Sequence, residues 1–286
     1  MILISKPSRY YELMDSGEGM KLERFGDFTL ARPDPQTLWN KSYPAFWEKA
    51  DANFSEKWKK KKDFPESWTI KLHDLSFSLE LGNFKHVGVF PEQIPNWQWM
   101  QNIINEGDEK ISVLNLFGYT GGATLACIKA GAEVTHLDGS RKAIEIAKEN
   151  LRLSNLNGNK VRWILDDAKK FVYREIKRGK KYNGVVLDPP IFGRGPKGEV
   201  WKIEEDLLPL ILYTQRLISE KPLFFLLNGY ASLYSAIAYK NILEGVFKSS
   251  GGNVEFGELA IEESSGARVL PAGIFSRWSN EERKTT

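Results

Sequence analysis

The pattern of apolar and polar positions divides the chain into two parts of different character. Over residues 19–35 and 67–82 the two kinds of residue alternate, which is typical of half-buried strands. A Gly-Asp pair at the centre of the first segment marks a turn between two strands. The pattern therefore predicts a small, mostly β N-terminal lobe over residues 1–105, whose last element is a short helix beginning near Trp97.

From Ser112 onward, apolar runs alternate with amphipathic stretches, which is the pattern of a doubly wound parallel sheet. The last two strands follow one another without a helix, so we expect one antiparallel edge strand on an otherwise parallel sheet. The predicted fold class is α/β, with a Rossmann-like seven-stranded sheet in residues 106–286 beside the β lobe. Strands are expected at 111–117, 133–138, 161–167, 182–190, 222–229, 253–264 and 268–278, and helices at 121–132, 141–156, 168–181, 204–219 and 232–251.

Composition narrows the class of protein without naming a function. The chain is 42% apolar and 27% charged, which is ordinary for a soluble globular protein. No apolar run approaches the length of a membrane span, and the N-terminus lacks the basic flank of a signal peptide. A single cysteine, Cys127, excludes a disulfide framework and any multi-cysteine metal site, and the three histidines show no ligand spacing. We expect a cytoplasmic protein without a metal.

The charge of the chain does not identify its binding partner. The net charge of +3 is too small to indicate nucleic-acid binding by itself, although it is compatible with a locally basic face. The lysine cluster at Lys57–Lys62 fits two interpretations. It is either a solvated linker or a patch that contacts phosphates.

Chemistry is expected at the carboxyl ends of the parallel strands, where ligands bind in open α/β sheets. The turn after the first strand contains Gly118, Gly121 and Gly122, which allow close approach of a ligand to the backbone and open a helix N-terminus. The spacing differs from the G-x-G-x-x-G fingerprint of dinucleotide-binding proteins. This difference argues against a nicotinamide oxidoreductase.

Acidic residues end the next strands in order. Asp138 ends the second strand, where it would either accept hydrogen bonds from ribose hydroxyls or cap the following helix. Asp166 or Asp167 ends the third strand, where a carboxylate can accept from an adenine amino group. Asp188 ends the fourth and begins an Asp-Pro-Pro sequence. Together with the glycine turn, this succession indicates a nucleotide-like cofactor.

These motifs resemble those of class I S-adenosylmethionine-dependent methyltransferases. The stretches at 113–125, 135–156, 166–171 and 187–194 resemble the branch that contains bacterial large-subunit ribosomal RNA methyltransferases of the cytosine-5 and guanine-N2 types. The resemblance covers about residues 90–278. The N-terminal lobe carries no pattern that matches the RNA-binding PUA domain of that branch.

The resemblance implies S-adenosylmethionine as cofactor, S-adenosylhomocysteine as its product and RNA as the expected partner. It implies that the turn from Phe117 to Thr120 cradles the methyl donor, that Asp138 binds the ribose and that Asp167 lies at the adenine. The residues expected to contact the donor are Phe90, Gln93, Asn115, Phe117, Gly118, Tyr119, Thr120, Gly121, Asp138, Gly139, Ser140, Asp166, Asp167, Ala168 and Asp188.

The residue types around the Asp-Pro-Pro sequence favour transfer to nitrogen or oxygen over transfer to carbon. Methylation of cytosine C5 needs a thiolate in the active-site loops, whereas Cys127 falls inside the helix after the first strand. A carboxylate and a proline carbonyl can instead accept the hydrogens of an exocyclic amine. The catalytic residues are therefore expected to be Asp188, Pro189, Pro190 and Phe192.

The aromatic residue that follows Asp-Pro-Pro in amino-methylating enzymes is displaced by one place here. Ile191 occupies its position and Phe192 comes next. Further substrate contacts are expected from Arg194, Lys197, Trp201 and Asn228, since cations and an aromatic ring suit phosphates and bases. A mobile loop that merely covers the donor would show the same composition.

The sequence thus predicts a methyltransferase that acts on a nitrogen or oxygen, with an RNA base as the favoured acceptor. Two alternatives stay open. One is a small-molecule methyltransferase, and the other is an RNA-binding or scaffold protein that binds the donor without catalysis.

Overall fold

The computed structural model describes residues 1–286 except 108–109, 157–160, 231–233, 265, 267 and 281–286. The Asn157-Gly158 pair, which directly follows the helix expected at 141–156 and is predicted to close it, lies outside the described residues. The chain forms two compact units. The larger unit contains Met1 with residues 96–258 and 273–286, and the smaller one contains residues 2–95 and 259–272. The predicted domain boundary at residue 105 lies at the end of helix α2, whereas the two units divide between residues 95 and 96 and the smaller unit also includes residues 259–272.

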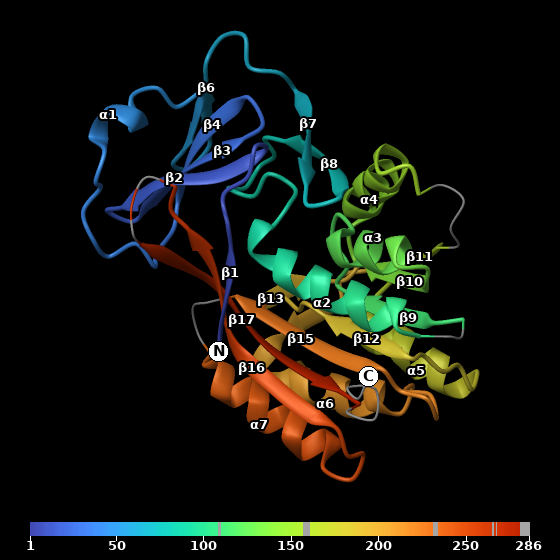
Figure 1. Ribbon diagram of the computed structural model, residues 1–286. Coiled ribbons are helices and arrows are strands. Elements are labelled where there is room, and N and C mark those ends of the chain that lie inside the picture. The colour runs from blue at the N-terminus through green and yellow to red at the C-terminus, as the bar shows by residue number, and fades with distance from the viewer. Residues whose placement is uncertain (108–109, 157–160, 231–233, 265, 267, 281–286) are drawn as a thin grey trace. The chain divides into compact units, whose positions relative to one another are not determined.

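The larger unit is an α/β sandwich around one twisted sheet, as the alternation of strands and helices predicted (Figure 1). Helices α2, α3 and α4 lie on one face of the sheet, and α5, α6 and α7 lie on the other (Figure 1). Its elements are α2 (Ile94–Asn105), β9 (Ser112–Leu116), α3 (Gly122–Lys129), β10 (Glu133–Asp138), α4 (Arg141–Leu153), β11 (Val161–Leu165), α5 (Ala168–Lys177), β12 (Gly184–Leu187), β13 (Phe192–Arg194), β14 (Val200–Lys202), α6 (Ile203–Gln215), β15 (Phe224–Tyr230), α7 (Ala236–Phe247), β16 (Asn253–Glu262) and β17 (Val269–Ser279).

The strand order of the sheet is β1-β16-β17-β15-β12-β9-β10-β11. Strands β11, β10, β9, β12 and β15 pair in parallel, and β17 pairs antiparallel with β15. The antiparallel strand was expected at the edge, but it is inserted between β15 and β16. After α7 the chain enters the sheet at β16, one place away from β15, and β17 then occupies the place between them. Hydrophobic periodicity does not show which of these two strands lies next to β15. The sequence analysis also did not assign β1 (Ile2–Ser5).

The core on the α5–α7 face is built from alternate residues of the central strands. Leu114 and Leu116 of β9, Val185 and Leu187 of β12, and Leu227 of β15 are completely buried against these helices. Because neighbouring side chains along a strand point to opposite faces, residues such as Asn115 and Asn228 face the other helical layer. This alternation brings polar groups to the face covered by α2 and α3.

The smaller unit is mostly β, as predicted. Its five-stranded sheet has the order β2-β3-β4-β5-β6, and β7 and β8 form a separate antiparallel pair. The predicted Gly-Asp turn joins β3 to β4. The elements are β2 (Tyr11–Gly17), β3 (Met20–Phe25), β4 (Phe28–Pro33), α1 (Pro44–Trp47), β5 (Ala52–Phe54), β6 (Trp58–Lys60), β7 (Ser67–Leu72), β8 (Leu75–Glu80) and the 3-10 helix η1 (Pro91–Gln93).

The smaller unit contains buried ion pairs. Glu23 is fully buried and pairs with Arg32 at 2.6 Å, while Lys21 pairs with Asp34 at 3.2 Å. Arg32 lowers the pKa of Glu23 despite the opposing effect of burial. Removal of one partner of such a pair would leave an uncompensated buried charge, so we expect it to be strongly destabilising.

Candidate functional site

The glycine turn after β9 adopts a strained backbone that only a few residue types accept readily. Phe117 and Tyr119 have φ angles of 59° and 47°, and Gly121 has a φ of 92°. Left-handed backbone costs a non-glycine residue about 1–2 kcal/mol, so the surrounding contacts must hold the turn in place. The Gly118 amide donates to the Leu137 carbonyl of β10 at 2.9 Å, which fixes the turn beside the neighbouring strand.

Gly118 is required because an imidazole ring lies directly against it. A Cβ at this position would come within 2.4 Å of His136 Cε1. The ring is fully buried, and burial lowers the pKa of His136 to about 3, so the imidazole is neutral. Its Nδ1 lies 2.9 Å from the Thr124 hydroxyl, which also accepts from Asn115 Nδ2 at 2.9 Å. Sequence reasoning missed the role of His136 because nothing in its spacing indicated one.

This network changes the interpretation of Asn115, which was expected to contact the donor. Its side chain is buried beneath the turn and donates to Thr124. Asn115 therefore supports the turn from below instead of facing a ligand above it. The same holds for Asn150, whose buried amide donates to the Thr120 carbonyl at 2.9 Å.

Asp138 ties the glycine turn to the turn after β10. Its Oδ2 accepts from the Tyr119 amide at 2.8 Å, and its Oδ1 accepts from the Ser140 amide at 2.7 Å. Burial raises the pKa of Asp138, and the backbone N–H groups of Ser140, Tyr119 and Gly139 oppose this shift. The helix cap that was the alternative role for Asp138 belongs to Ser140, whose hydroxyl accepts from the Ala143 amide.

The two acids after β11 have different roles. Asp166 forms an ion pair with Arg174 and accepts from the amide of its neighbour Asp167. Asp167 is buried and caps α5, since its Oδ1 accepts from the Lys170 amide at 2.9 Å. Ala168 is the buried first residue of that helix. The contact of either carboxylate with an adenine amino group stays a prediction.

Asp188 follows β12 at the next place along the sheet edge. Its amide donates to the Leu116 carbonyl at 3.4 Å, which continues the ladder toward the glycine turn. The residue is accessible to solvent, yet surrounding protein atoms desolvate the carboxylate and raise its pKa to about 6. The phenol of Tyr239 on α7 is close enough that the charge of Asp188 contributes, after burial, to raising the Tyr239 pKa.

The Asp-Pro-Pro loop is braced by an indole. Trp201 Nε1 donates to the Pro190 carbonyl at 2.6 Å, and the Trp201 ring packs against Phe117 with centroids 4.9 Å apart. Trp201 is only 4% exposed. The expectation that Trp201 would stack on a substrate is therefore wrong, because its ring is part of the core.

A short hairpin that the sequence analysis treated as a loop follows the two prolines. In it, β13 and β14 pair antiparallel with Gly193 opposite Trp201. Phe192 is 56% exposed, and Arg194 and Lys197 are exposed as well. These three side chains are exposed to solvent, and their contact with a substrate stays a prediction.

The tip of the β13–β14 hairpin lies against the turn after β10. A Cβ on Gly139 would be 3.3 Å from the Arg194 carbonyl oxygen. Lys170 of α5 pairs with Glu199 at 2.7 Å, and Lys169 donates to the Val200 carbonyl at 3.2 Å. The Lys170 hydrogen bond lowers the pKa of Glu199 to about 2. The hairpin is therefore anchored on α5 and passes beside the loop that carries Asp138.

Asn228 lies near the end of β15, the strand beside β12. It is buried, and its Oδ1 accepts from Asn96 Nδ2 of α2 at 3.0 Å. The parallel register pairs Leu187 with Leu227, so Asp188 and Asn228 are the next residues on adjacent strands. The structure thus brings Asn228 to the acidic end of β12.

Three further expected features lie elsewhere. Phe90 and Gln93 belong to the smaller unit, next to and within η1, so their contact with a donor stays a prediction. Within the lysine cluster, Lys61 pairs with Asp51 at 2.8 Å, which favours a structural role for that residue.

Cys127 does not carry accessible thiol chemistry. It is buried in α3 with its sulfur 3.9 Å from Met100 Sδ, and burial raises its pKa to about 12. Among the described residues, no group of three or more His, Cys, Asp or Glu side chains is arranged to hold a metal. None of the helices in the described part of the chain combines the length and the apolar character that a membrane span requires.

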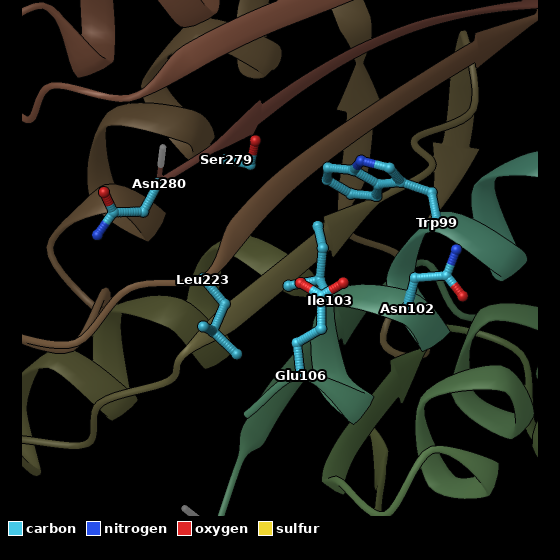
Figure 2. Close-up of a pocket in the computed structure, with 7 residues that line it drawn as sticks. All are labelled: Trp99, Asn102, Ile103, Glu106, Leu223, Ser279 and Asn280. Atoms are coloured by element: carbon cyan, nitrogen blue, oxygen red, sulfur yellow. The ribbon is translucent and has the colours of Figure 1, made fainter. Parts of the chain in front are cut away.

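A hollow at the opposite end of the strands is separate from this site. Figure 2 shows it between the second half of α2, the start of β15 and the end of β17. The Trp99 side chain borders it, and its ring lies 4.5 Å from the guanidinium of Arg277. The lining residues are Trp99, Asn102, Ile103, Glu106, Leu223, Ser279 and Asn280.

Comparison with known proteins gives a consistent result. The model of a family described as S-adenosylmethionine-dependent methyltransferase matches residues 50–205. The crystal structure of a SAM-dependent methyltransferase from Agrobacterium tumefaciens is 40% identical with a TM-score of 0.95, and the match covers 98% of this chain and 94% of that one.

Curated relatives match over shorter stretches. Ribosomal RNA large subunit methyltransferase I of Klebsiella pneumoniae is 36% identical over 81 residues, which are 28% of this chain and 20% of that protein. Ribosomal RNA large subunit methyltransferase K/L of Syntrophotalea carbinolica is 29% identical over 167 residues, 58% of this chain and 22% of that protein. The chain spans less than a third of the length of each of these relatives.

Proposed function

Because the chain belongs to the S-adenosylmethionine-dependent methyltransferase family, we propose that it transfers a methyl group from this donor to a nitrogen (or an oxygen) of an RNA base. The observation that carries the proposal is the position of Asp188, a poorly solvated carboxylate beside the glycine turn. The names of the curated relatives support RNA as the acceptor. We also propose that the reaction takes place in the cytoplasm.

The strained turn fits the donor. The left-handed backbone at Phe117 and Tyr119, together with the close packing of Gly118 on the buried His136 ring, holds the turn in one fixed shape. In the proposed complex, the turn from Phe117 to Thr120 holds the amino-acid part of the donor. Asp138 accepts from the ribose hydroxyls, and Asp167 accepts from the adenine amino group. Phe90 and Gln93 complete the proposed set, with Gly121, Gly139, Ser140 and Ala168 providing backbone contacts.

S-adenosylmethionine, when bound, supplies a methyl group that its sulfonium already activates. The protein must then hold a lone pair of the acceptor about 3–3.5 Å from that carbon and in line with the breaking bond. The Asp188 carboxylate and the Pro189 carbonyl accept the two hydrogens of an amino group. These hydrogen bonds draw the nitrogen lone pair out of the aromatic ring and toward the methyl group.

Asp188 also suits the proton that the reaction releases. Methylation of an amine produces a cationic nitrogen that must lose a proton, and a carboxylate with a pKa of about 6 is a good acceptor near neutral pH. Exposed Phe192 can stack on the base, while Arg194 and Lys197 can contact phosphates. Carbon methylation through a thiolate is disfavoured because Cys127 is buried in α3.

Two measurements test this function separately. Calorimetry should show binding of S-adenosylmethionine and of its demethylated product. Incubation with labelled donor and total RNA from a strain lacking the gene should then transfer label to RNA, and nucleoside mapping should find methyl on a base nitrogen (or oxygen). Donor binding without labelled RNA would favour a small-molecule acceptor or a non-catalytic protein, and the absence of donor binding would overturn the proposal altogether.

A further inference from the structure

A buried chain of hydrogen bonds ends at Asn228. It begins at Glu255 of β16, which pairs with Arg277 of β17 at 2.8 Å. Arg277 Nη1 donates to Asn96 Oδ1 at 3.4 Å, and Asn96 Nδ2 donates to Asn228 Oδ1 at 3.0 Å. Asn96 and Asn228 are at most 3% exposed. The network therefore lies in the interior, where hydrogen-bond geometry is closely specified.

The direction of this chain is fixed by Arg277. A guanidinium group can only donate hydrogen bonds, so the Asn96 oxygen must face it. The Asn96 nitrogen then faces Asn228 and can only donate, so Asn228 must present its own oxygen in return. Both choices follow from the chemistry of the arginine, which leaves Nδ2 of Asn228 as the group available to a ligand.

Packing keeps Arg277 in place. Its guanidinium lies over the Trp99 ring at 4.5 Å and over the Phe275 ring at 5.2 Å, in addition to its ion pair with Glu255. Figure 2 shows the Trp99 ring projecting from α2 toward the strands. Rotation of Arg277 would break several contacts at once, so the orientation it imposes on the two amides is stable.

The amide of Asn228 is positioned beside the proposed acceptor site. Asp188 and Asn228 directly follow the paired residues Leu187 and Leu227 on neighbouring parallel strands. The Tyr239 hydroxyl of α7 lies on the opposite face of β15 from the Asn228 side chain, since a Cβ on Gly229 would be 2.6 Å from it. The site thus combines hydrogen-bond acceptors at Asp188 and Pro189 with one oriented donor at Asn228.

We propose that Asn228 is a specificity-determining residue that selects an amino group next to an unprotonated ring nitrogen, as in adenine or cytosine. This inference rests on the proposed function. Asp188 and Pro189 accept the amino hydrogens, and Asn228 Nδ2 donates to the lone pair of the adjacent ring nitrogen. Asn96 acts as a positioning residue, because it determines which end of the Asn228 amide faces the base.

Other bases match this arrangement less well. Uracil has no amino group to offer to Asp188. The pairing edge of guanine has an N–H beside its amino group, so it would place a donor against the Asn228 donor. The remaining ring nitrogen next to that amino group, N3, is separated from the glycosidic nitrogen by a single carbon, so the ribose crowds the approach to it. Unlike guanine and uracil, adenine and cytosine offer an amino group beside a lone pair on an accessible edge.

The direction of the relay can be reversed without altering a group in contact with substrate. In Asn96→Asp, the new carboxylate accepts from Arg277 and also requires a donor from Asn228. The Asn228 amide must then rotate and turn its oxygen toward the base. We expect kcat/KM toward total RNA to fall on the order of 100-fold because two acceptors now oppose each other. Donor affinity should stay within about threefold of the wild type, since the substitution does not alter the donor half, which is the turn from Phe117 to Thr120 together with Asp138 and Asp167.

Two further variants complete the design. Asn228→Asp keeps the acceptor that Asn96 needs but removes the donor, so its kcat/KM should fall at least as far. Asn102→Asp is the matched control, because it makes the same exchange at an exposed position of α2 and should behave like the wild type. Thermal unfolding and donor calorimetry establish that each variant is folded.

The readout is the methylated nucleoside together with kcat/KM. The inference expects the wild type to place methyl on the amino nitrogen of adenine or cytosine, with both relay variants impaired. Methyl on guanine, on a carbon or on ribose would overturn it while leaving the methyltransferase function intact. A folded Asn96→Asp variant with wild-type kcat/KM would overturn the relay. Donor binding without transfer to RNA would overturn the proposed RNA function itself.

Discussion

Asp138 and Asp188 lie at the ends of parallel strands of the same sheet, yet their carboxylates differ in the hydrogen bonds that they accept and in the cause of their raised pKa. Asp138 accepts backbone hydrogen bonds from two turns, which partly offset the effect of burial on its pKa. The raised pKa of Asp188 comes only from desolvation of the carboxylate by surrounding protein atoms. The backbone of the fold donates hydrogen bonds to the Asp138 carboxylate. A ligand that donates to the Asp188 carboxylate would offset the desolvation of that group.

The difference extends to the regions around them. The donor half is locked from below by His136, Thr124 and Asn115 and from the side by Asn150. The acceptor half carries exposed Phe192 on a short hairpin. We infer that the first half is built to bind one constant molecule in one pose, and the second to meet a variable partner. The predictions below test this division.

The largest effect is expected at Asp188. In Asp188→Asn the side chain keeps its shape but can no longer act as a full acceptor or take up a proton. We expect kcat to fall about 100- to 10,000-fold, while calorimetry shows donor affinity within a few-fold of the wild type. A comparable loss of donor binding would mean that the two halves are not separate.

The converse result is expected at Asp138. Asp138→Ala removes the acceptor for the Tyr119 and Ser140 amides and the proposed contact with ribose. We expect donor affinity to fall on the order of 100-fold in calorimetry. The methyl-transfer rate at saturating donor should change much less. A rate loss as large as that of Asp188→Asn would contradict the division.

Two glycine substitutions compare a position where an added Cβ meets a buried ring with a position where it meets no other atom. Gly118→Ala places a methyl group against the buried His136 ring and should lower the free energy of unfolding by about 1–3 kcal/mol. Gly245→Ala lies in α7, where nothing is within 4 Å of the added Cβ, and should raise that free energy by about 0.5–1 kcal/mol. Urea denaturation measures both, and equal effects would mean that the imidazole moves aside freely.

The smallest effect is a pH dependence. Protonation of Asp188 with its pKa of about 6 should reduce kcat/KM below pH 6 and leave a plateau above it. For stability the sign is opposite. The folded pKa exceeds the ordinary value of 3.8, so the folded state binds the proton more tightly and this group adds stability as pH falls from about 6 toward 4. Asp188→Asn should remove both trends, and their persistence would assign them to another group.

The sequence predicted the strands and helices themselves better than it predicted which strands lie next to each other in the sheet. Apolar runs and glycine turns located the strands, the helices and the order of acidic residues at the sheet edge, because each depends on local periodicity. The place of β17 inside the sheet and the addition of β1 depend on contacts between distant segments. No local pattern distinguishes these arrangements from their alternatives.

The site shows the same limit at the level of side chains. Trp201 and Asn115 had the residue types of ligand contacts, but the structure buries both as supports. His136 had no motif, and its role is visible only because Gly118 of another segment lies over it. Sequence reasoning located the edge of the sheet where chemistry would occur, but it could not tell which polar groups face outward.

Trp201 joins the two halves through one rigid ring, with its Nε1 on Pro190 and its face against Phe117. Its substitution should therefore give non-additive effects when combined with changes in either half. New acceptor preferences can arise by exchange of exposed residues such as Phe192 and Arg194, which leave this brace untouched. The indole thus holds the Asp-Pro-Pro loop at a fixed position relative to the glycine turn, whichever exposed residues surround them.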